Sequence, residues 1–237
     1  MFLDDKVDIL LIIKEYELLK NNLRNDIYET DRKIFMSKQK WKPGNMVYPL
    51  PAVMVSCRDK AGNDNIITVA WTGTVCTNPP MAYISVRPSR HSYEMIKETG
   101  EFVINLTTEE LSFATDYCGV TSGRDIDKFE RCNLHKVEAD EVNVPLIDES
   151  PVNIECRVRE IHEYGSHTMF VADVLCVHAD DKYMDESGKF DLQKARLLAY
   201  SHGTYFGLTS PQGTFGYSVK KKNKKGKSEA KELKTKN

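Results

Sequence analysis

The sequence contains 237 residues, of which 41% are hydrophobic and 29% are charged. This length allows either one large domain or two small ones. Basic and acidic residues nearly balance, at 33 and 35, and leave a formal net charge of −2. Such a balance gives no support to nucleic acid or an anionic membrane as the main partner. The polar excess lies mostly at the two ends, so the middle of the chain has enough apolar residues for a core.

The cysteine spacing argues against a thiol-based metal or redox motif. No two of the six cysteines form a C-x-x-C pair, so zinc and thioredoxin-type sites have no support. The longest early apolar run, residues 9–13, is too short for a signal peptide or a membrane span. We therefore expect a cytoplasmic protein with reduced thiols and no membrane contact.

The two ends of the chain differ from its middle. Residues 1–36 are predicted to form an N-terminal helical extension, because Val7, Leu10 and Leu11 begin an apolar pattern with roughly helical spacing. This helix could pack on a partner subunit, but a loosely attached extension is the simpler interpretation. Residues 220–237 are rich in lysine and poor in apolar side chains, which is typical of a disordered basic tail.

Residues 37–219 are predicted to form one domain built mostly from strands. β-branched and aromatic residues gather in runs that are bounded by turn signals such as Lys60-Ala61-Gly62-Asn63-Asp64 and Asn78-Pro79-Pro80. Because short turns join many of these runs, we expect the strands to pair antiparallel. The predicted strands cover residues 47–57, 66–75, 81–86, 102–106, 152–161 and 168–177.

Two short helices are expected to interrupt the strands. The first covers residues 90–99, with Ser89 as its N-cap and Gly100 just past its end. The second starts at Thr107, where Thr107 and Glu110 have the spacing of a capping box. Strands and helices do not alternate regularly, so a Rossmann or flavodoxin sheet is disfavoured. The pattern favours a β-barrel with helical excursions.

The segment that leads from a predicted strand into the first helix has the composition of a phosphate site. A helix N-terminus presents unpaired backbone N–H groups and a partial positive charge, which suit a phosphate. Arg87 and Arg90 add full charges and bidentate donors. Ser89, His91 and Ser92 add further short-range donors. A capped helix with solvated arginines is the alternative that this segment alone leaves open.

A second informative segment, residues 65–73, combines small side chains with a predicted strand. In a strand, Thr68, Ala70 and Thr72 would share one face, and small residues there let a flat ring approach the backbone. Gly73 permits a bulge or a close approach. The backbone groups of this segment could pair with the polar edge of an isoalloxazine. A buried strand with a core tryptophan is the alternative.

Together these segments resemble the flavin reductase-like, FMN-binding split-barrel family, and most closely its flavoredoxin-like branch. The resemblance covers about residues 40 to 220, and its order and spacing make it specific. The matching segments are Tyr48-Pro49-Leu50-Pro51, Asn65-x-x-Thr68-x-Ala70-Trp71-x-Gly73, Asn78-Pro79-Pro80, Ser85-Val86-Arg87-Pro88-Ser89-Arg90, Gly100-Glu101-Phe102-Val103-Ile104-Asn105, Asp116-Tyr117-Cys118-Gly119, Ser122-Gly123-Arg124-Asp125-x-Asp127-Lys128-Phe129, Ala139-x-x-Val142-Asn143-x-Pro145-Leu146-Ile147 and Gly165-Ser166-His167.

The resemblance implies a mostly β fold with short helices, an antiparallel Greek-key split β-barrel, and FMN held at a homodimer interface. It implies a phosphate site at Arg87, Ser89, Arg90, His91 and Ser92, and a ring site along Thr68, Val69, Ala70 and Trp71, near Ser85. It also brings the turn of Cys118 and Gly119, and the loop from Arg124 to Lys128, near the flavin or the partner subunit. Histidine at position 91 departs from the tyrosine or threonine of the family pattern.

The function implied is redox chemistry carried by FMN, which needs no protein acid or base in its minimal form, so no catalytic residue is assigned. The leading hypothesis is a flavin reductase-like oxidoreductase that takes electrons from a reduced nicotinamide. The sequence lacks a G-x-G-x-x-G fingerprint, so the nicotinamide would stack directly on the flavin. One alternative is a flavoredoxin-like electron carrier that relays electrons between protein partners without its own NAD(P)H turnover. Another is a non-catalytic flavin-binding module.

No metal site is predicted. His162, His167 and His178 lie in strand regions without the grouping of metal ligands, so structural or surface roles are favoured. The acidic residues around Gly188 do not fit an EF-hand and indicate a solvated hairpin turn. Cys118 is interpreted as a buried, inert thiol rather than a redox group, because reactivity needs exposure and a lowered pKa.

Overall fold

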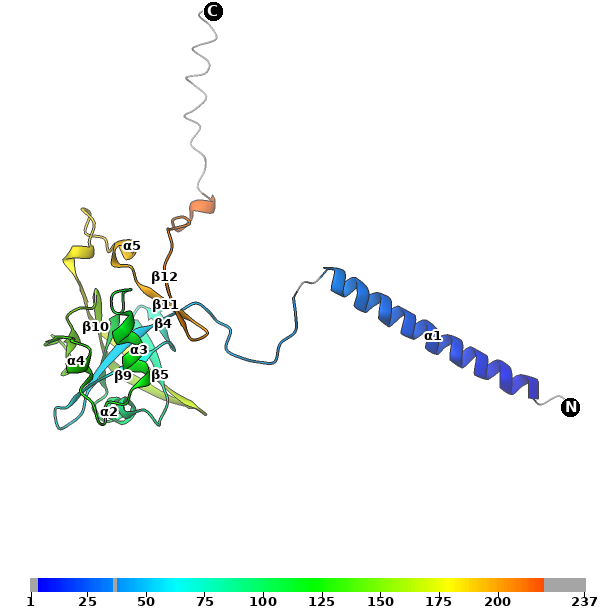
Figure 1. Cartoon of the computed structure of the whole chain (residues 1–237), viewed down its shortest axis with the longest axis horizontal. Helices are drawn as coiled ribbons and strands as arrows, with labels where there is room; N and C mark the ends of the chain where they lie inside the picture. The colour runs from blue at the N-terminus through cyan, green and yellow to red at the C-terminus, as the bar shows by residue number, and fades with distance from the viewer. Residues whose placement is uncertain (1–3, 36–37, 220–237) are drawn as a thin grey trace, which may run out of the picture. The chain divides into compact units, whose positions relative to one another are not determined.

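The structure is a computed structural model, and it describes residues 4–35 and 38–219 (Figure 1). The chain divides into two units, Met1–Met46 and Val47–Asn237. The first contains one long helix, α1 (Asp4–Phe35), in the region where a helical extension is predicted. None of the described helices is long and apolar enough to cross a membrane. The lysine-rich segment 220–237 lies outside the described residues.

The second unit is built on a seven-stranded antiparallel sheet, which confirms the predicted mostly β, antiparallel fold. Strands β6, β9 and β10 are consecutive neighbours, and β5, which precedes them in the chain, lies beside β10. This is the connectivity of a Greek key read in the reverse chain direction. In spatial order the strands are β3 (Asp64–Val69), β2 (Val53–Arg58), β6 (Glu101–Leu106), β9 (Val152–Tyr164), β10 (His167–Ala179), β5 (Pro80–Val86) and β4 (Thr72–Thr77).

The sheet curls back on itself, so that its two ends approach each other. Only Ala70 and Trp71 separate β3 from β4, although these strands stand at opposite ends of the strand order. The Ser85 N–H, on β5, donates a hydrogen bond to the Trp71 carbonyl at 2.8 Å and extends the pairing of β4 with β5. The main core fills the inside of the curl and includes Val53, Val55 and Phe102. Because the sheet closes only in part, it leaves an opening near the chain segment between β3 and β4.

Both faces of the central strands are buried, which explains their nearly continuous apolar sequences. On β2, Val53 and Val55 point into the main core, while Met54 points to the opposite face. There Met54 packs with residues of the short helices, among them Ala114 and Phe129. These helices are α3 (Ser112–Val120) and α4 (Lys128–Arg131), whereas α2 (His91–Thr99) packs on the main core through residues such as Ile96.

The first predicted helix forms, but its N-cap differs from the prediction. Arg90, not Ser89, occupies the N-cap position of α2, and no side chain caps the helix there. Gly100 ends α2 as predicted, with the left-handed φ of 71° that favours glycine, and its N–H donates to the Ile96 carbonyl. The prediction failed at the start because a serine next to a helix is a frequent cap but not an obligatory one.

The second predicted helix begins later than its supposed capping box. Thr107 is buried, with 2% of its surface exposed, and its hydroxyl donates to the Ala52 carbonyl instead of capping a helix. The helix α3 starts only at Ser112. A tertiary hydrogen bond between distant segments therefore overrides the local sequence signal.

The predicted strand of residues 66–75 is two strands. β3 ends at Val69 and β4 begins at Thr72, because the chain crosses here from one end of the sheet to the other. The Thr72 hydroxyl donates to the Tyr83 carbonyl and helps to fix β4 on β5. Thr68, Ala70 and Thr72 therefore do not share the face of one strand as predicted.

Several short elements have no counterpart in the sequence prediction. The predicted strand of residues 47–57 is divided at Ala52, and its first part pairs with the C-terminal region to form a small separate sheet. The acidic segment around Gly188 is largely exposed and contains a turn, as expected. The short elements are β1 (Leu50–Pro51), β7 (Lys136–Val137), β8 (Leu146–Ile147), η1 (Asp181–Tyr183), α5 (Leu192–Ala195), β11 (Leu198–Ser201), β12 (Thr204–Gly207) and η2 (Tyr217–Val219).

Candidate functional site

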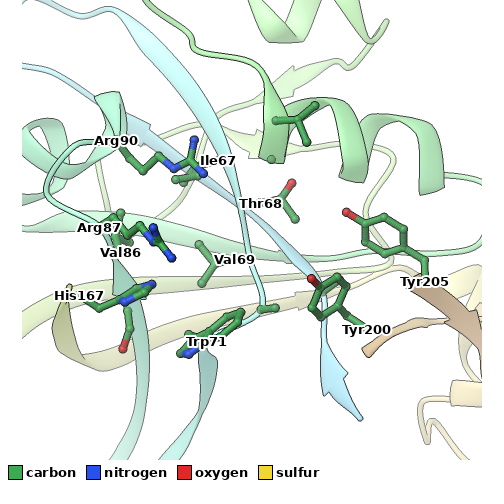
Figure 2. Close-up of a pocket in the computed structure, with 15 residues that line it drawn as sticks. Ile67, Thr68, Val69, Trp71, Val86, Arg87, Arg90, His167, Tyr200 and Tyr205 are labelled. Carbon is green, nitrogen blue, oxygen red and sulfur yellow. The ribbon is translucent and has the colours of Figure 1, made fainter. Parts of the chain in front are cut away.

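A pocket of about 370 Å³ lies at the opening of the curled sheet (Figure 2). Ala70 and Trp71 line it from the segment between β3 and β4, outside the regular strand pairing. The Trp71 carbonyl accepts a hydrogen bond from the Ser85 N–H, whereas Ala70 belongs to neither strand. The pocket is lined by Ala52, Ile67, Thr68, Val69, Ala70, Trp71, Ser85, Val86, Arg87, Arg90, Gly119, Val120, His167, Tyr200 and Tyr205.

One wall of this larger pocket is aromatic and cationic. The rings of Trp71 and His167 stack, with centroids 5.8 Å apart and planes inclined by 11°. Figure 2 shows Arg87, Arg90 and His167 along the same side of the pocket. Burial, and then the positive charge of Arg87, lowers the pKa of His167. The His167 ring is therefore held in its neutral form near Arg87.

The opposite side of the larger pocket is formed by two tyrosines from the C-terminal sheet. Tyr200 lies on β11 and Tyr205 on β12, and both rings face β3 across the pocket in Figure 2. The Tyr205 hydroxyl donates to the Asp116 carboxylate at 3.3 Å. Burial, and then the charge of Asp116, raises the pKa of Tyr205 to about 12. This phenol therefore keeps its proton at neutral pH.

A smaller pocket of about 60 Å³ adjoins the larger one, since both share Ile67, Arg90 and Gly119. It lies where the start of α2, the end of α3 and the following loop meet β3. Its lining is Asn65, Ile67, Ser89, Arg90, His91, Ser92, Cys118, Gly119, Thr121, Ser122, Gly123, Arg124 and Lys128.

The smaller pocket is positively charged. Arg90, Arg124 and Lys128 line it, and none of the described residues in its lining is acidic. Lys128 is only 4% exposed, and its ammonium donates to the carbonyls of Ile66 at 2.7 Å and Cys118 at 2.9 Å. Burial lowers the pKa of Lys128. A buried cation held by neutral carbonyls would gain from a nearby anion.

The field in the smaller pocket acts on His91. Burial, and then the positive charges of Arg124 and Lys128, lowers the pKa of His91. The same residue begins α2, whose first turn has no side-chain cap. The positive end of the α2 dipole therefore adds to the side-chain charges, an arrangement that suits a phosphate or another compact anion.

Two glycines allow the close packing around the smaller pocket. A Cβ atom at Gly123 would lie 2.0 Å from Oδ1 of Asn65, and a Cβ atom at Gly119 would lie 3.2 Å from Cβ of Thr68. Asn65 in turn donates from Nδ2 to the Ser92 hydroxyl at 2.8 Å, which ties β3 to α2. A side chain at Gly123 would therefore displace the residue that aligns these two elements.

All thirteen residues predicted for the site line one of the two pockets. Thr68, Val69, Ala70, Trp71, Ser85 and Arg87 line the larger pocket, Ser89, His91, Ser92, Cys118 and Lys128 line the smaller, and Arg90 and Gly119 line both. This places them together, while their contacts with a ligand remain a prediction.

Some of the predicted residues have side chains that are already engaged. The Thr68 hydroxyl donates to the Thr115 carbonyl, and Ser92 accepts from Asn65. Burial raises the pKa of the Cys118 thiol to about 12, so this thiol is unreactive and only its carbonyl, which holds Lys128, has a positioning role. Arg87 lines the larger pocket rather than the smaller one.

Sequence reasoning left four residues that line the pockets out of the predicted site. Arg124 was expected near the flavin only as the start of a loop, and His167 was expected in a structural or surface role, although each stands in a family-like segment. Tyr200 and Tyr205 had no such signal, because β11 and β12, which carry them, are only four residues long, and β11 pairs with the distant β1.

Comparisons with known proteins agree with this architecture. A model of the flavin reductase like domain matches residues 45–209. An uncharacterized protein of Archaeoglobus fulgidus is 34% identical over 167 residues, which cover 70% of this chain and 92% of that protein. The flavoredoxin of Desulfovibrio vulgaris (Miyazaki F) has a TM-score of 0.73 at 26% identity, covering 77% of this chain and all of that one. Flavoredoxin from Methanosarcina acetivorans has a TM-score of 0.71 at 28% identity, covering 78% of this chain and all of that one.

The chain therefore belongs to the flavin reductase-like family and resembles its flavoredoxin-like branch, as the sequence motifs indicated. Its mostly β, antiparallel domain is a split barrel.

The charges of the smaller pocket predict how His91 titrates. We expect its pKa to lie below the usual 6.5 in the ligand-free protein. Replacing Arg124 by glutamine removes one of the repelling charges, so the pKa of His91 should rise. The pKa of His91 should still remain below 6.5 in this variant, because burial is the largest cause of its lowering. NMR titration of the imidazole measures both values.

His135 provides an internal control for this titration. A hydrogen bond to Glu149 raises its pKa, and it does not line either pocket. The pKa of His135 should be the same in the unchanged protein and in Arg124→Gln. A His91 pKa that does not change in Arg124→Gln would contradict the positive field assigned to the smaller pocket.

Proposed function

We propose that the protein binds FMN, with the phosphate in the smaller pocket and the isoalloxazine in the larger one. The observation that carries this proposal is that the two pockets adjoin and share Ile67, Arg90 and Gly119. An aromatic-lined cavity lies beside a small cationic one, and FMN has the matching order of a flat ring, a polar chain and a phosphate. The family, and the flavoredoxins of similar structure, support the same cofactor.

The smaller pocket suits the phosphate for three reasons. Arg90 and Arg124 offer planar donors that can pair with two phosphate oxygens. The uncapped start of α2 offers backbone N–H groups. Lys128 adds a buried positive charge close by without needing to reach the phosphate itself. Arg87, which was expected at the phosphate, is better placed beside the ring or the polar chain.

The larger pocket suits the ring. Its volume of about 370 Å³ is within the usual range for small-molecule sites. The peptide group of Ala70 and the N–H of Trp71 are proposed to pair with the polar edge of the ring, while the Trp71 carbonyl is held by the Ser85 N–H. Tyr200 and Trp71 offer aromatic surface that would exclude water from it.

The reaction we propose is the transfer of electrons or hydride from a reduced nicotinamide to flavin or another acceptor. FMN supplies the redox chemistry when bound, and the protein residues bind and orient it. No residue is assigned as an acid or a base, because a hydride transfer to flavin needs none in its minimal form. The family supports an oxidoreductase in general. We propose in addition that the electron donor is a reduced nicotinamide.

A second candidate function is electron transfer between protein partners without turnover of NAD(P)H. Two solved structures similar to this chain are flavoredoxins, with 26% and 28% sequence identity over their full lengths. Their similarity favours this function as directly as the family favours a reductase. The two functions share the FMN site and differ only in the electron donor.

A homodimer is part of the proposal. Phe113 and Val120 on α3 leave large apolar side chains exposed, and Val120 also lines the larger pocket. A second copy packed on this face would cover both side chains and help to enclose the ring. Interfaces of this permanent kind usually bury more than about 2,000 Å². Light scattering of the FMN-loaded protein should give twice the chain mass, and a monomeric mass at micromolar concentration would contradict the dimer.

The phosphate assignment predicts a selective loss of affinity. Arg124→Gln and Arg90→Ala should each weaken FMN, while riboflavin, which lacks the phosphate, should be nearly unaffected. One charge-assisted hydrogen bond is worth about 1.5–3 kcal/mol, or about ten- to a hundredfold in affinity. Both arginines are exposed, so we expect the lower end of this range. Fluorescence titration with the two flavins measures the ratio.

Arg159→Gln is the matched control for these variants. Arg159 is exposed, pairs with Asp173 and lines neither pocket, so the variant should bind both flavins like the unchanged protein. Equal losses of FMN and riboflavin in the Arg124 variant would rule out a phosphate in the smaller pocket. A protein that binds neither flavin at all would remove the proposal as a whole.

Reduction by nicotinamide separates the two candidate functions. We expect the FMN-loaded protein to lose its oxidised flavin absorbance when NADH or NADPH is added without oxygen. If both nucleotides leave the flavin oxidised while a reduced redox protein bleaches it, the electron carrier is the correct function. If no biological donor reduces it, although dithionite does, the protein is a flavin-binding module without redox turnover.

A further inference from the structure

Four side chains of metal-binding type meet on β9 and β10 and on the loop that precedes β8, none of them in the lining of the flavin pockets. They are Asp140, Glu155, Cys176 and His178, and one ligand atom from each lies within 4.8 Å of all the others. Their positions in the sequence gave no hint of this, because spacing alone predicted no partners for His178. The fold brings them together from three segments.

The strands present three of these side chains on one face of the sheet. Cys176 and His178 are two residues apart on β10, and Glu155 stands directly opposite Cys176 on β9. This placement depends on a β-bulge. The register shifts between Val174 and Cys176, so Leu175 is the extra residue. Without the shift, Leu175 would lie opposite Glu155, and Cys176 would lie opposite Ile154. Cys176 would then point to the other face of the sheet, away from Glu155. Bulges often re-aim side chains at functional sites.

Two of the distances between ligand atoms are close to those around a tetrahedral divalent cation. Bonds of about 2.3 Å to sulfur and about 2.1 Å to nitrogen around zinc place the two ligand atoms about 3.5 Å apart. Sγ of Cys176 and Nε2 of His178 are 3.5 Å apart. Nε2 of His178 is 3.8 Å from a carboxylate oxygen of Asp140, close to the same geometry. Its 2.6 Å contact with Oε1 of Glu155 is a hydrogen bond, which a cation would have to widen.

Glu155 is preorganised for such a role. Its side chain is fully buried, and the backbone N–H groups of Asp140, Glu141 and Val142 donate to its two oxygens. These bonds fix the carboxylate so that Oε1 faces His178. The proton on Nε2 of His178, in the hydrogen bond to Glu155, occupies the place that a cation would take. When the cation binds, this proton and the proton of the Cys176 thiol would both be released to the solvent.

We infer that Asp140, Glu155, Cys176 and His178 form a binding site for a borderline divalent cation of the zinc type. Nitrogen, thiolate sulfur and carboxylate oxygen together are the ligands that zinc accepts in proteins. The half-exposed side of His178 and the exposed Asp140 leave a path for the ion to enter. The alternative is a structural hydrogen bond between His178 and Glu155 with no affinity for metals. This inference does not depend on the flavin proposal.

Cobalt(II) titration of the chelator-treated full-length protein tests the site. Cobalt(II) replaces zinc and gives a visible spectrum that reports tetrahedral geometry and a thiolate ligand. We expect saturation at one ion per chain, with a thiolate-to-cobalt charge-transfer band, and displacement of the cobalt by zinc. Cys176→Ser should abolish the charge-transfer band, and His178→Ala should weaken binding by more than about tenfold.

His162→Ala and Cys76→Ser are the matched controls. His162 also lies on β9 and pairs with a glutamate, Glu160, at 2.8 Å, but no cysteine adjoins the pair. Cys76 is half-exposed like Cys176 but belongs to β4. Both variants should bind cobalt like the unchanged protein. Absence of saturable binding, or binding that persists in both Cys176→Ser and His178→Ala, would overturn the inference. Circular dichroism confirms that each variant is folded.

Discussion

The buried ammonium of Lys128 is the interaction on which the candidate flavin site depends. It joins the Ile66 carbonyl on β3 to the Cys118 carbonyl near the end of α3, and so holds a strand and a helix beside the same small pocket. A charge in this position is costly unless it is paired or hydrogen-bonded. The two carbonyls supply hydrogen bonds but no negative charge, which leaves the local field positive. The structure thus keeps a positive charge that the anionic group of a ligand would neutralise.

Other parts of the site follow from this arrangement. The segment between α3 and α4 must turn tightly against Asn65, which Gly123 permits. Asn65 then aligns Ser92 and the start of α2, whose first residues, His91 and Ser92, line the same pocket as Arg124. The larger pocket arises from a different constraint, the incomplete closure of the sheet between β3 and β4. Packing therefore forms the ring site, while electrostatics forms the phosphate site.

The sequence predicted those parts of the fold and site that depend on local pattern. The long strands, the left-handed end of α2 at Gly100 and the segment from Arg87 to Ser92 all have signals within a few residues. Features that depend on distant partners were missed. Thr107 resembles a helix cap but donates to Ala52, and Tyr200 enters the pocket on a short strand that pairs with β1. The cluster around His178 is of the same kind, because a bulge in β10 brings its members together.

The most direct test of the central claim is phosphorus NMR of FMN bound to the protein, recorded across pH. The second pKa of a phosphate ester is near 6 in solution. If the phosphate lies among Arg90, Arg124 and Lys128, these charges stabilise its dianion and lower that pKa. The resonance of bound FMN should then stay at its dianion position from about pH 8 to about pH 5.5, below the solution pKa. A bound phosphate that titrates like free FMN would contradict the proposed site.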